Sequence, residues 1–520
     1  MTTFAISRRA LCLVAGALAS TYMIGSTGAL AQSATTNPDA TIQVAIAYGL
    51  SGTFDPLNAS GAVTQAANWH VFEGLVDLDP VTRKPYAALA AEMPTSQDGL
   101  TYTIKLRKDA VFHNGAPVTA DDVVFSFTRV LDPASKSLFR SFVSFIDKVE
   151  AVSEDTVKIT TKFPFSLFNE RLGSVKIVPK AAVEADADGF GKLPIGSGPY
   201  KLVSAVPEAQ IVFTRNDAYT GPRPALAKEM VWNLIADPTA RVNALTSGTV
   251  MAMEDVPYVD ADAVAAATTL EKTQSFGLLF AMFNTAAKPF DDVRVRQAFF
   301  YALNMDKIIG TGMLDNATAA TSFLPKTHPN YHQASTVYTY DPDKAKSLLA
   351  EAGTPKLDIT LMSTDHGWVK DVAPIIKESL DAVGFNTTLD IGQSGGQYTK
   401  VDAGKMQVMI APGDPSVFGN DPDILMQWWY GDNIWPTKRF QWSASAKYGE
   451  LTGLLNEAQR LTGADQQEKW NKAFDLLSEE VPLYPLFHRQ LPTAWDAEQL
   501  EGFAPVPTTG LSFLGVGVKQ

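Results

Sequence analysis

The sequence contains one pentapeptide with the spacing of a serine nucleophile. Gly392-Gln393-Ser394-Gly395-Gly396 matches the pattern G-x-S-x-G and follows a strand-like segment, Thr387–Ile391. A hydrolase holds its serine on a sharp turn in this context. The segment after Ser394 is short and polar, however, and the next histidine along the chain is His488. A secreted serine hydrolase that uses Ser394 is therefore the alternative hypothesis and not the first one.

Metal and cofactor chemistry has little support in the residues. His328 and His332 are four apart, but Pro329 and Asn330 between them indicate a loop. The six histidines form no H-E-x-x-H motif, and no glycine-rich phosphate-binding motif occurs. We expect no metal, no cofactor and no enzymatic activity.

The N-terminus has the features of an export signal. Arg8-Arg9 precede an apolar stretch, Ala10–Ile24, and Ala29-Leu30-Ala31 forms a cleavage site. We expect residues 1–31 to be removed and the mature protein to be periplasmic, by either the general or the twin-arginine route. The only cysteine, Cys12, would leave with the signal.

Composition bounds the class of protein. The chain has 520 residues, of which 46% are hydrophobic and 19% charged, and its net charge is −13. An acidic chain of this kind repels nucleic acid, so we expect no nucleic-acid partner. Its length predicts two or three domain-sized units.

Strand-like and helix-like segments alternate, which predicts an α/β fold. Strands are predicted at 41–46, 100–106 and 156–160, and helices at 119–130, 291–305, 341–352, 372–383 and 468–480. Thr119 would cap its helix, with Asp121 and Asp122 in the first turn. Gly99 and Gly115 are expected at turns.

A series of short motifs marks a known family. They are Phe72–Val76, Asp98–Arg107, Val111–Val123, Gly196–Leu202, Pro289–Ala298, and Asp341–Leu349 followed by Gly353. Together and in this order, they resemble the family 5 extracellular solute-binding proteins, the dipeptide- and oligopeptide-binding-like proteins that serve peptide, nickel and opine importers. The matches spread over nearly the whole mature chain.

The resemblance implies a two-lobe periplasmic binding protein fold of type II, of the large class with an inserted subdomain. Lobe I would comprise 40–78, 195–280 and 490–520, the inserted subdomain 79–194, and lobe II 281–489. The ligand cleft would lie at the hinge, where the chain crosses near 276–284 and 484–491. The protein would be a monomer that closes on a short peptide or an opine- or sugar-like conjugate and delivers it to the permease subunits of an ABC importer.

The resemblance also places candidate ligand contacts in the second lobe. Gly413 and Asp414 follow the predicted strand 407–411, at the position where dipeptide-binding relatives pair an acid with the ligand's amine. Helix capping is the other interpretation of this acid and of its neighbours Asp421 and Asp423, and for Asp423 we favour the cap.

Relatives hold the peptide carboxylate with an arginine after another strand, here 357–362. The sequence has no arginine there; Asp365 and His366 follow instead. A carboxylate clamp would have to come from elsewhere.

Aromatic and loop residues complete the predicted cleft. Trp69, Trp428 and Trp429 are candidates for stacking on a ligand. Of the adjacent pair, at most one should enter the cleft, because neighbours on a helix point about 100° apart. Tyr48 and Gly49, in the loop after the first strand, and Glu254 are further candidates.

Overall fold

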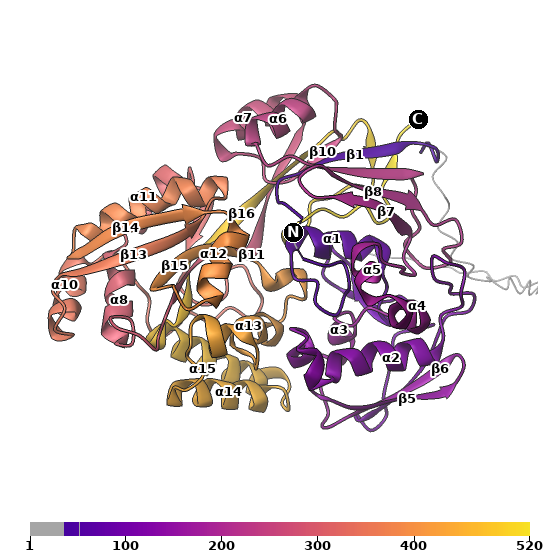
Figure 1. Ribbon diagram of the computed structural model, residues 1–520, viewed down its shortest axis with the longest axis horizontal. Coiled ribbons are helices and arrows are strands. Elements are labelled where there is room, and N and C mark those ends of the chain that lie inside the picture. Colours follow the sequence, from indigo (N-terminus) through magenta and orange to yellow (C-terminus); the bar gives the residue numbers. More distant parts are fainter. Residues whose placement is uncertain (1–35, 51) are drawn as a thin grey trace, which may run out of the picture. The chain divides into compact units, whose positions relative to one another are not determined.

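The fold is described by a computed structural model for residues 36–50 and 52–520 (Figure 1). The predicted signal peptide, 1–31, and Cys12 lie outside the described residues. Within the part of the chain that the structure describes, no helix is long and apolar enough to cross a membrane.

One eleven-stranded mixed sheet runs through the molecule. Its strands, in spatial order, are β14 (Phe385–Gly392), β13 (Leu357–Thr364), β15 (Val408–Gly413), β11 (Thr269–Phe283), β16 (Leu483–Trp495), β10 (Ala252–Met253), β1 (Thr41–Ile46), β9 (Glu229–Leu234), β8 (Gln210–Arg215) and β7 (Tyr200–Val206). A further strand, β12 (Ala317–Ala319), pairs with β16. Mixed parallel and antiparallel pairing with helices on the sheet confirms the predicted α/β class.

Two long antiparallel strands, β11 and β16, join the two ends of this sheet. Their register shifts between Gln274 and Leu278 and again between Leu279 and Phe280. Gly277 lies inside the first irregularity, and a Cβ there would come within 2.8 Å of the Ser275 hydroxyl. The break in pairing thus falls just before β11, still paired with β16, also begins to pair with β15 at Leu278.

Three smaller sheets complete the strands. In the first, β2 (Val76–Leu78) pairs with β3 (Pro85–Ala87). In the second, the central strand β6 (Thr156–Thr161) pairs with β4 (Thr101–Lys105) on one side and β5 (Ile146–Ser153) on the other. In the third, β17 (Leu500–Glu501) pairs with β18 (Gly517–Val518).

The helices up to residue 310 are α1 (Ala62–Val71), α2 (Ala120–Leu131), α3 (Phe168–Leu172), α4 (Lys180–Ala185), α5 (Ala187–Lys192), α6 (Pro238–Thr246), α7 (Ala261–Ala267), α8 (Val293–Ala302) and α9 (Met305–Lys307). Those that follow are α10 (Pro342–Glu351), α11 (Gly367–Asp381), α12 (Ser394–Asp402), α13 (Pro422–Tyr430), α14 (Ala446–Ala458) and α15 (Gly463–Glu480). α11 packs on β13 and β14, and α8 packs on α10 (Figure 1).

Several helix ends and turns were predicted correctly from local signals. Thr119 and Asp122 form the capping box of α2, each side chain bonding the other's backbone N–H. Gly99 and Gly115 have φ of 71° and 84°, the left-handed region that glycine tolerates. α11 and α15 begin five residues earlier than predicted, because Gly367, Pro374 and Gly463 are poor helix formers and hid the first turns.

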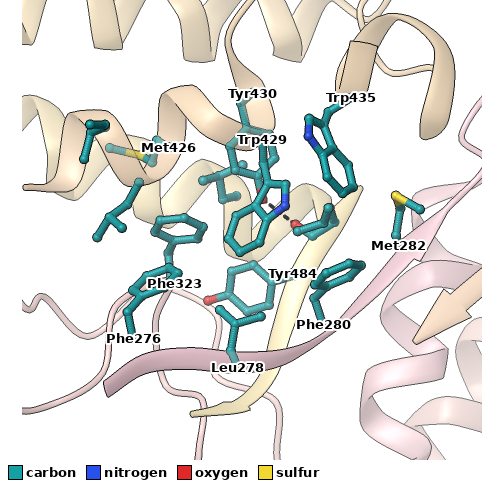
Figure 2. Packing of buried hydrophobic residues seen from close by; sticks show 14 of the residues in the cluster. Phe276, Leu278, Phe280, Met282, Phe323, Met426, Trp429, Tyr430, Trp435 and Tyr484 are labelled. Carbon is teal, nitrogen blue, oxygen red and sulfur yellow. Dashed lines mark hydrogen bonds between the residues drawn. The ribbon is translucent and has the colours of Figure 1, made fainter. Parts of the chain in front are cut away.

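Trp429 belongs to the hydrophobic core. It is 1% exposed and packs among Phe276, Phe280 and Phe323, with ring centroids 5.7–6.0 Å away (Figure 2). Such edge and tilted contacts fill space between β11 and α13 and stabilise their packing. A solute could reach this ring only by displacing core side chains. In the structure Trp429 therefore has a packing role and not the predicted ligand contact.

Candidate functional site

Side chains from four distant segments meet near the carboxyl end of β1. Tyr48 follows β1, Asp255 follows β10, and Arg489 lies on β16, which pairs with β10. Arg489 donates from Nη1 to Asp255 Oδ1 at 2.6 Å and from Nη2 to Tyr48 Oη at 2.7 Å. Its guanidinium carbon lies 4.7 Å from the ring centroid of Trp368, at the start of α11. A buried cation is thus fully surrounded by partners.

His366 completes this polar cluster. Its ring centroid lies 5.1 Å from that of Tyr48, in an edge-on arrangement. Burial lowers the pKa of His366, and the charges of Asp255 and Asp365 oppose that shift. The structure therefore places Tyr48 against His366, the neighbour of Asp365, more than 300 residues further along the chain.

Glu254 is a buried carboxylate beside the same cluster. It is 5% exposed, and its Oε1 accepts a hydrogen bond from the backbone N–H of Ala47 at 3.0 Å. Burial raises its pKa to about 7, helped by the neighbouring Asp255 and opposed by Arg241 and Arg489. Glu254 is poised between its neutral and charged forms near neutral pH.

Glu254 and Tyr48 line a narrow pocket of about 180 Å³. Thr509 and Gly510, from the C-terminal segment, form part of its wall. This volume is below the 300 Å³ or so that small-molecule sites usually need. The pocket would therefore hold only part of a ligand, such as one polar group.

Asp414 lies between this pocket and a larger one. Its Oδ2 accepts hydrogen bonds from the N–H and the hydroxyl of Thr509 at 2.8 and 2.9 Å, and Oδ1 accepts from the N–H of Ser416 at 3.3 Å. Asp414 caps the short 3₁₀ turn 415–417. Asp414 is therefore a cap that also contacts the pocket wall, and its pairing with a ligand's amine stays a prediction.

The larger pocket opens to solvent and has about 570 Å³ of empty space when the open region is included, but only about 50 Å³ of it can hold the centre of a water molecule. It is lined by residues from two distant parts of the chain: Pro56, Gln65, Asn68, Trp69, Leu78, Arg83, Phe139, Gly173, Ser174, Lys176, Val417 and Phe418. The pocket therefore has room for one group of a solute, since whole small molecules usually occupy about 300 Å³ or more. Trp69 is the only predicted ligand contact among these residues.

The other predicted contacts have different surroundings. Trp428 lies 4.7 Å from Phe418, centroid to centroid, and so backs the larger pocket without lining it. Gly413 makes room for the core, because a Cβ there would lie 2.6 Å from the Trp429 ring. Gly49 is exposed and has no heavy atom within 4 Å of an added Cβ.

The acids after Asp414 have structural partners. Asp421, and not Asp423, caps α13 by accepting the N–H of Ile424 at 3.0 Å, which corrects the predicted cap. Both acids also accept from Arg171 of α3, at 2.6 and 2.8 Å. Asp423 faces inward because the buried Arg171 supplies its counter-charge.

The residues considered for a serine hydrolase and for a metal site make other contacts in the structure. Ser394 begins α12, and no hydrogen bond among the described residues joins it to a histidine; His488 Nδ1 contacts the Phe276 carbonyl at 2.9 Å. His328 contacts the Asn420 carbonyl, and His332 contacts Asp475. Within 36–50 and 52–520 no group of three metal-ligating side chains is placed to hold an ion.

Two arginines of the site, Arg83 and Arg489, were missed from the sequence. Arg83 lies in the turn between β2 and β3, and Arg489 lies inside an apolar strand. Neither belongs to a motif. A single arginine in an otherwise apolar strand such as 483–495 is the one signal that marks a buried cation.

Comparison with known proteins decides the family. The model of the bacterial extracellular solute-binding proteins, family 5, matches residues 84–446. The chain belongs to this family. It is a solute-binding protein and not an enzyme, so Ser394 has no nucleophilic role.

Relatives of this family 5 protein cover almost its whole length. The glutathione-binding protein GsiB of Escherichia coli K12 is 30% identical over 482 residues, which are 89% of this chain and 91% of GsiB. AgaA from A. tumefaciens R10, solved in complex with agropinic acid, has a TM-score of 0.82 at 26% identity and covers 92% of this chain and 99% of its own. DppA from Helicobacter pylori, solved with the peptide STSA, has a TM-score of 0.82 at 23% identity, covering 94% and 99%. The predicted binding-protein fold is confirmed.

Proposed function

We propose that this chain captures a short peptide, or a peptide- or opine-like conjugate, and delivers it to the permease subunits of an ABC importer. The observation that carries the proposal is a polar site assembled from distant segments: Tyr48 packs on His366, and Tyr48 and Glu254 line one pocket together with Thr509, which donates to Asp414. Relatives that bind glutathione, agropinic acid and a peptide support this class of solute.

The polar cluster favours a ligand with an ammonium group. Two carboxylates, Glu254 and Asp414, lie near Thr509. Glu254 is buried and forms no ion pair among the described residues, so its charged form is disfavoured. An ammonium at this place would pair with Glu254 and lower its pKa. Ligand contacts to both sides of the site would then favour the closed arrangement of the lobes.

Export is part of the proposal. Cleavage after Ala31 would release a mature periplasmic chain that acts as a monomer, with the site formed by residues from Tyr48 onward.

Calorimetric titration with glutathione, a dipeptide panel, a tetrapeptide and agropinic acid tests the proposed function. We expect one-to-one binding of at least one compound without turnover. Asp414→Asn should weaken that binding tenfold or more, because an amide cannot accept both Thr509 donors and an ammonium. Asp306→Asn, at an exposed position, is the matched control. Product release from any compound, or full affinity in Asp414→Asn, would contradict the proposal.

A further inference from the structure

The larger pocket contains buried polar atoms without partners. Arg83 Nε, Ser174 Oγ and Asn68 Oδ1 have no hydrogen-bond partner among the described residues, and all three residues line this pocket. Unpaired buried donors and acceptors cost about 1–3 kcal/mol each, so native proteins rarely keep them without a ligand to satisfy them. Two of the three atoms are donors.

Arg83 is also an unpaired charge. Its Nη2 donates to the backbone carbonyl of Ser416, but no ion pair among residues 36–50 and 52–520 includes it. The two acids that act on it from a distance, Asp79 and Asp414, are engaged elsewhere: Asp79 pairs with Arg223, and Asp414 accepts from Thr509. Burial consequently lowers the pKa of Arg83 to about 10.

The other cation of the pocket is neutralised. Lys176 is paired with Asp77, which also accepts the N–H of Gly74 at 3.0 Å. The pocket wall therefore carries one positive charge, at Arg83, that is in no ion pair among the described residues and feels Asp414 and Asp79 only from a distance. A carboxylate brings one negative charge and accepts two parallel hydrogen bonds from a guanidinium, whereas a phosphate monoester would bring nearly two charges.

The rest of the wall is apolar and aromatic. Phe139 and Phe418 lie 5.3 Å apart, centroid to centroid, and Trp69 borders the same space. Such a surface suits the carbon skeleton or side chain next to a carboxylate.

We propose that the larger pocket binds a carboxylate of the solute through Arg83 and Ser174, with the adjoining apolar part of the solute against Trp69 and Phe418. The inference rests on the proposed function and narrows it: the solute is a free acid, and Arg83 supplies the clamp that is absent after Met362. Asn68 Oδ1 accepts a hydrogen bond from a donor near that carboxylate.

Paired ligands test this inference. Glutathione, a dipeptide mixture and agropinic acid are each offered to the purified full chain as the free acid and as the carboxamide, and the retained compounds are quantified by mass spectrometry. Wild-type protein should retain the acid at least tenfold over the amide. In Arg83→Gln this ratio should fall below two, because the guanidinium and its charge are lost, and in Ser174→Ala it should fall severalfold, because one hydroxyl donor is lost.

Arg215→Gln is the matched control, since Arg215 pairs with Asp217 and does not line the pocket. It should keep the wild-type ratio. Ser174→Ala leaves Arg83 in place and carries the test if Arg83→Gln fails to fold. Equal retention of acid and amide by wild type, or an unchanged ratio in Arg83→Gln or Ser174→Ala, overturns this inference alone. Retention of neither form by wild type overturns the proposed function and this inference together.

Discussion

Glu254 carries a proton over a wider pH range in the folded protein than in the unfolded chain. Its pKa is about 7 when folded, against an ordinary value of 4.5, and burial is the main cause. The folded state therefore binds the proton more tightly. The stabilisation that this proton provides is complete below pH 4.5 and is lost as the pH rises to about 7.

Replacement of Glu254 by glutamine removes this pH dependence. An amide stays neutral and still offers an oxygen to the Ala47 N–H, so Glu254→Gln should exceed wild type in free energy of unfolding by on the order of 3 kcal/mol at pH 8 and match it near pH 4.5. Urea denaturation at the two pH values measures the difference. Glu92→Gln, at an exposed position, serves as control. A constant difference at both pH values would contradict the assignment.

At the level of single residues, the sequence predicted the members of the polar cluster better than their roles. Tyr48 and Glu254 lie together because they follow the neighbouring strands β1 and β10, and His366, which follows the more distant β13, contacts Tyr48. Trp429 and Gly413 turned out to serve packing, which depends on neighbours that are distant in sequence. Arg83 and Arg489 could not be predicted, because their roles depend on neighbours in space. Arg83 has no ion-pair partner among the described residues, whereas Arg489 donates to Asp255 and Tyr48.

At the scale of elements, α3 and α13 are joined by a buried ion pair. The Arg171 side chain is 0% exposed and donates to Asp421 and Asp423, and Gln459 adds a hydrogen bond to Asp423 at 3.1 Å. Burial raises the pKa of Asp423, and the Arg171 charge opposes that shift. The contact links the segment 168–172 to the start of α13, 250 residues further along the chain.

Removal of the Arg171 charge should destabilise the protein strongly. Arg171→Met leaves two carboxylates without their counter-charge, and the expected loss is about 3–5 kcal/mol. Arg140 pairs with Asp432 across the same two parts of the chain but is 35% exposed, so Arg140→Met should cost at most about 1 kcal/mol. Chemical denaturation compares them, and equal losses in the two variants would refute the role of burial.

Element ends followed local rules wherever a cap was visible in the sequence. Thr119 caps α2 as predicted, and Asp341 caps α10, because N-cap chemistry acts within three residues. The start of α13 differs, since Asp421 caps it while Asp423 is drawn inward by Arg171. The local sequence around Asp423 does not indicate Arg171 as its partner, because the two residues are about 250 positions apart.

At the scale of the whole molecule, the solute should stabilise the folded chain by mass action. A ligand at 100 times its dissociation constant adds about 2.7 kcal/mol to the free energy of unfolding. A chain of this length has an unfolding entropy of roughly 1 kcal/mol/K, at about 2 cal/mol/K per residue, so the melting temperature should rise by about 3 °C. Calorimetric scans with and without saturating ligand measure this shift. Asp414→Asn should show less of it at the same ligand concentration, and an equal shift in both proteins would contradict the site.

The fold class was predictable because family motifs occur along the whole chain, but the sheet order was not. The motifs predicted an α/β binding protein, and the sheet and the relatives confirm it. The pairing of β1 with β10 and of β10 with β16 joins segments more than 200 residues apart, such as Val44 with Ala252 and Ala252 with Trp495. Periodicity along the chain carries no information about such partners. The lobe boundaries stay a prediction.

Thr509 has a consequence for how the protein comes into being. The site includes Tyr48, which follows β1 and is synthesised early, and Thr509, which lies in the part of the site that is synthesised last. A ribosome-bound chain can fold its early domains as they emerge, but it has no complete site until residue 509 is free. The chain can therefore bind its solute only after nearly all of it has been synthesised, so it cannot capture solute in the cytosol during most of translation.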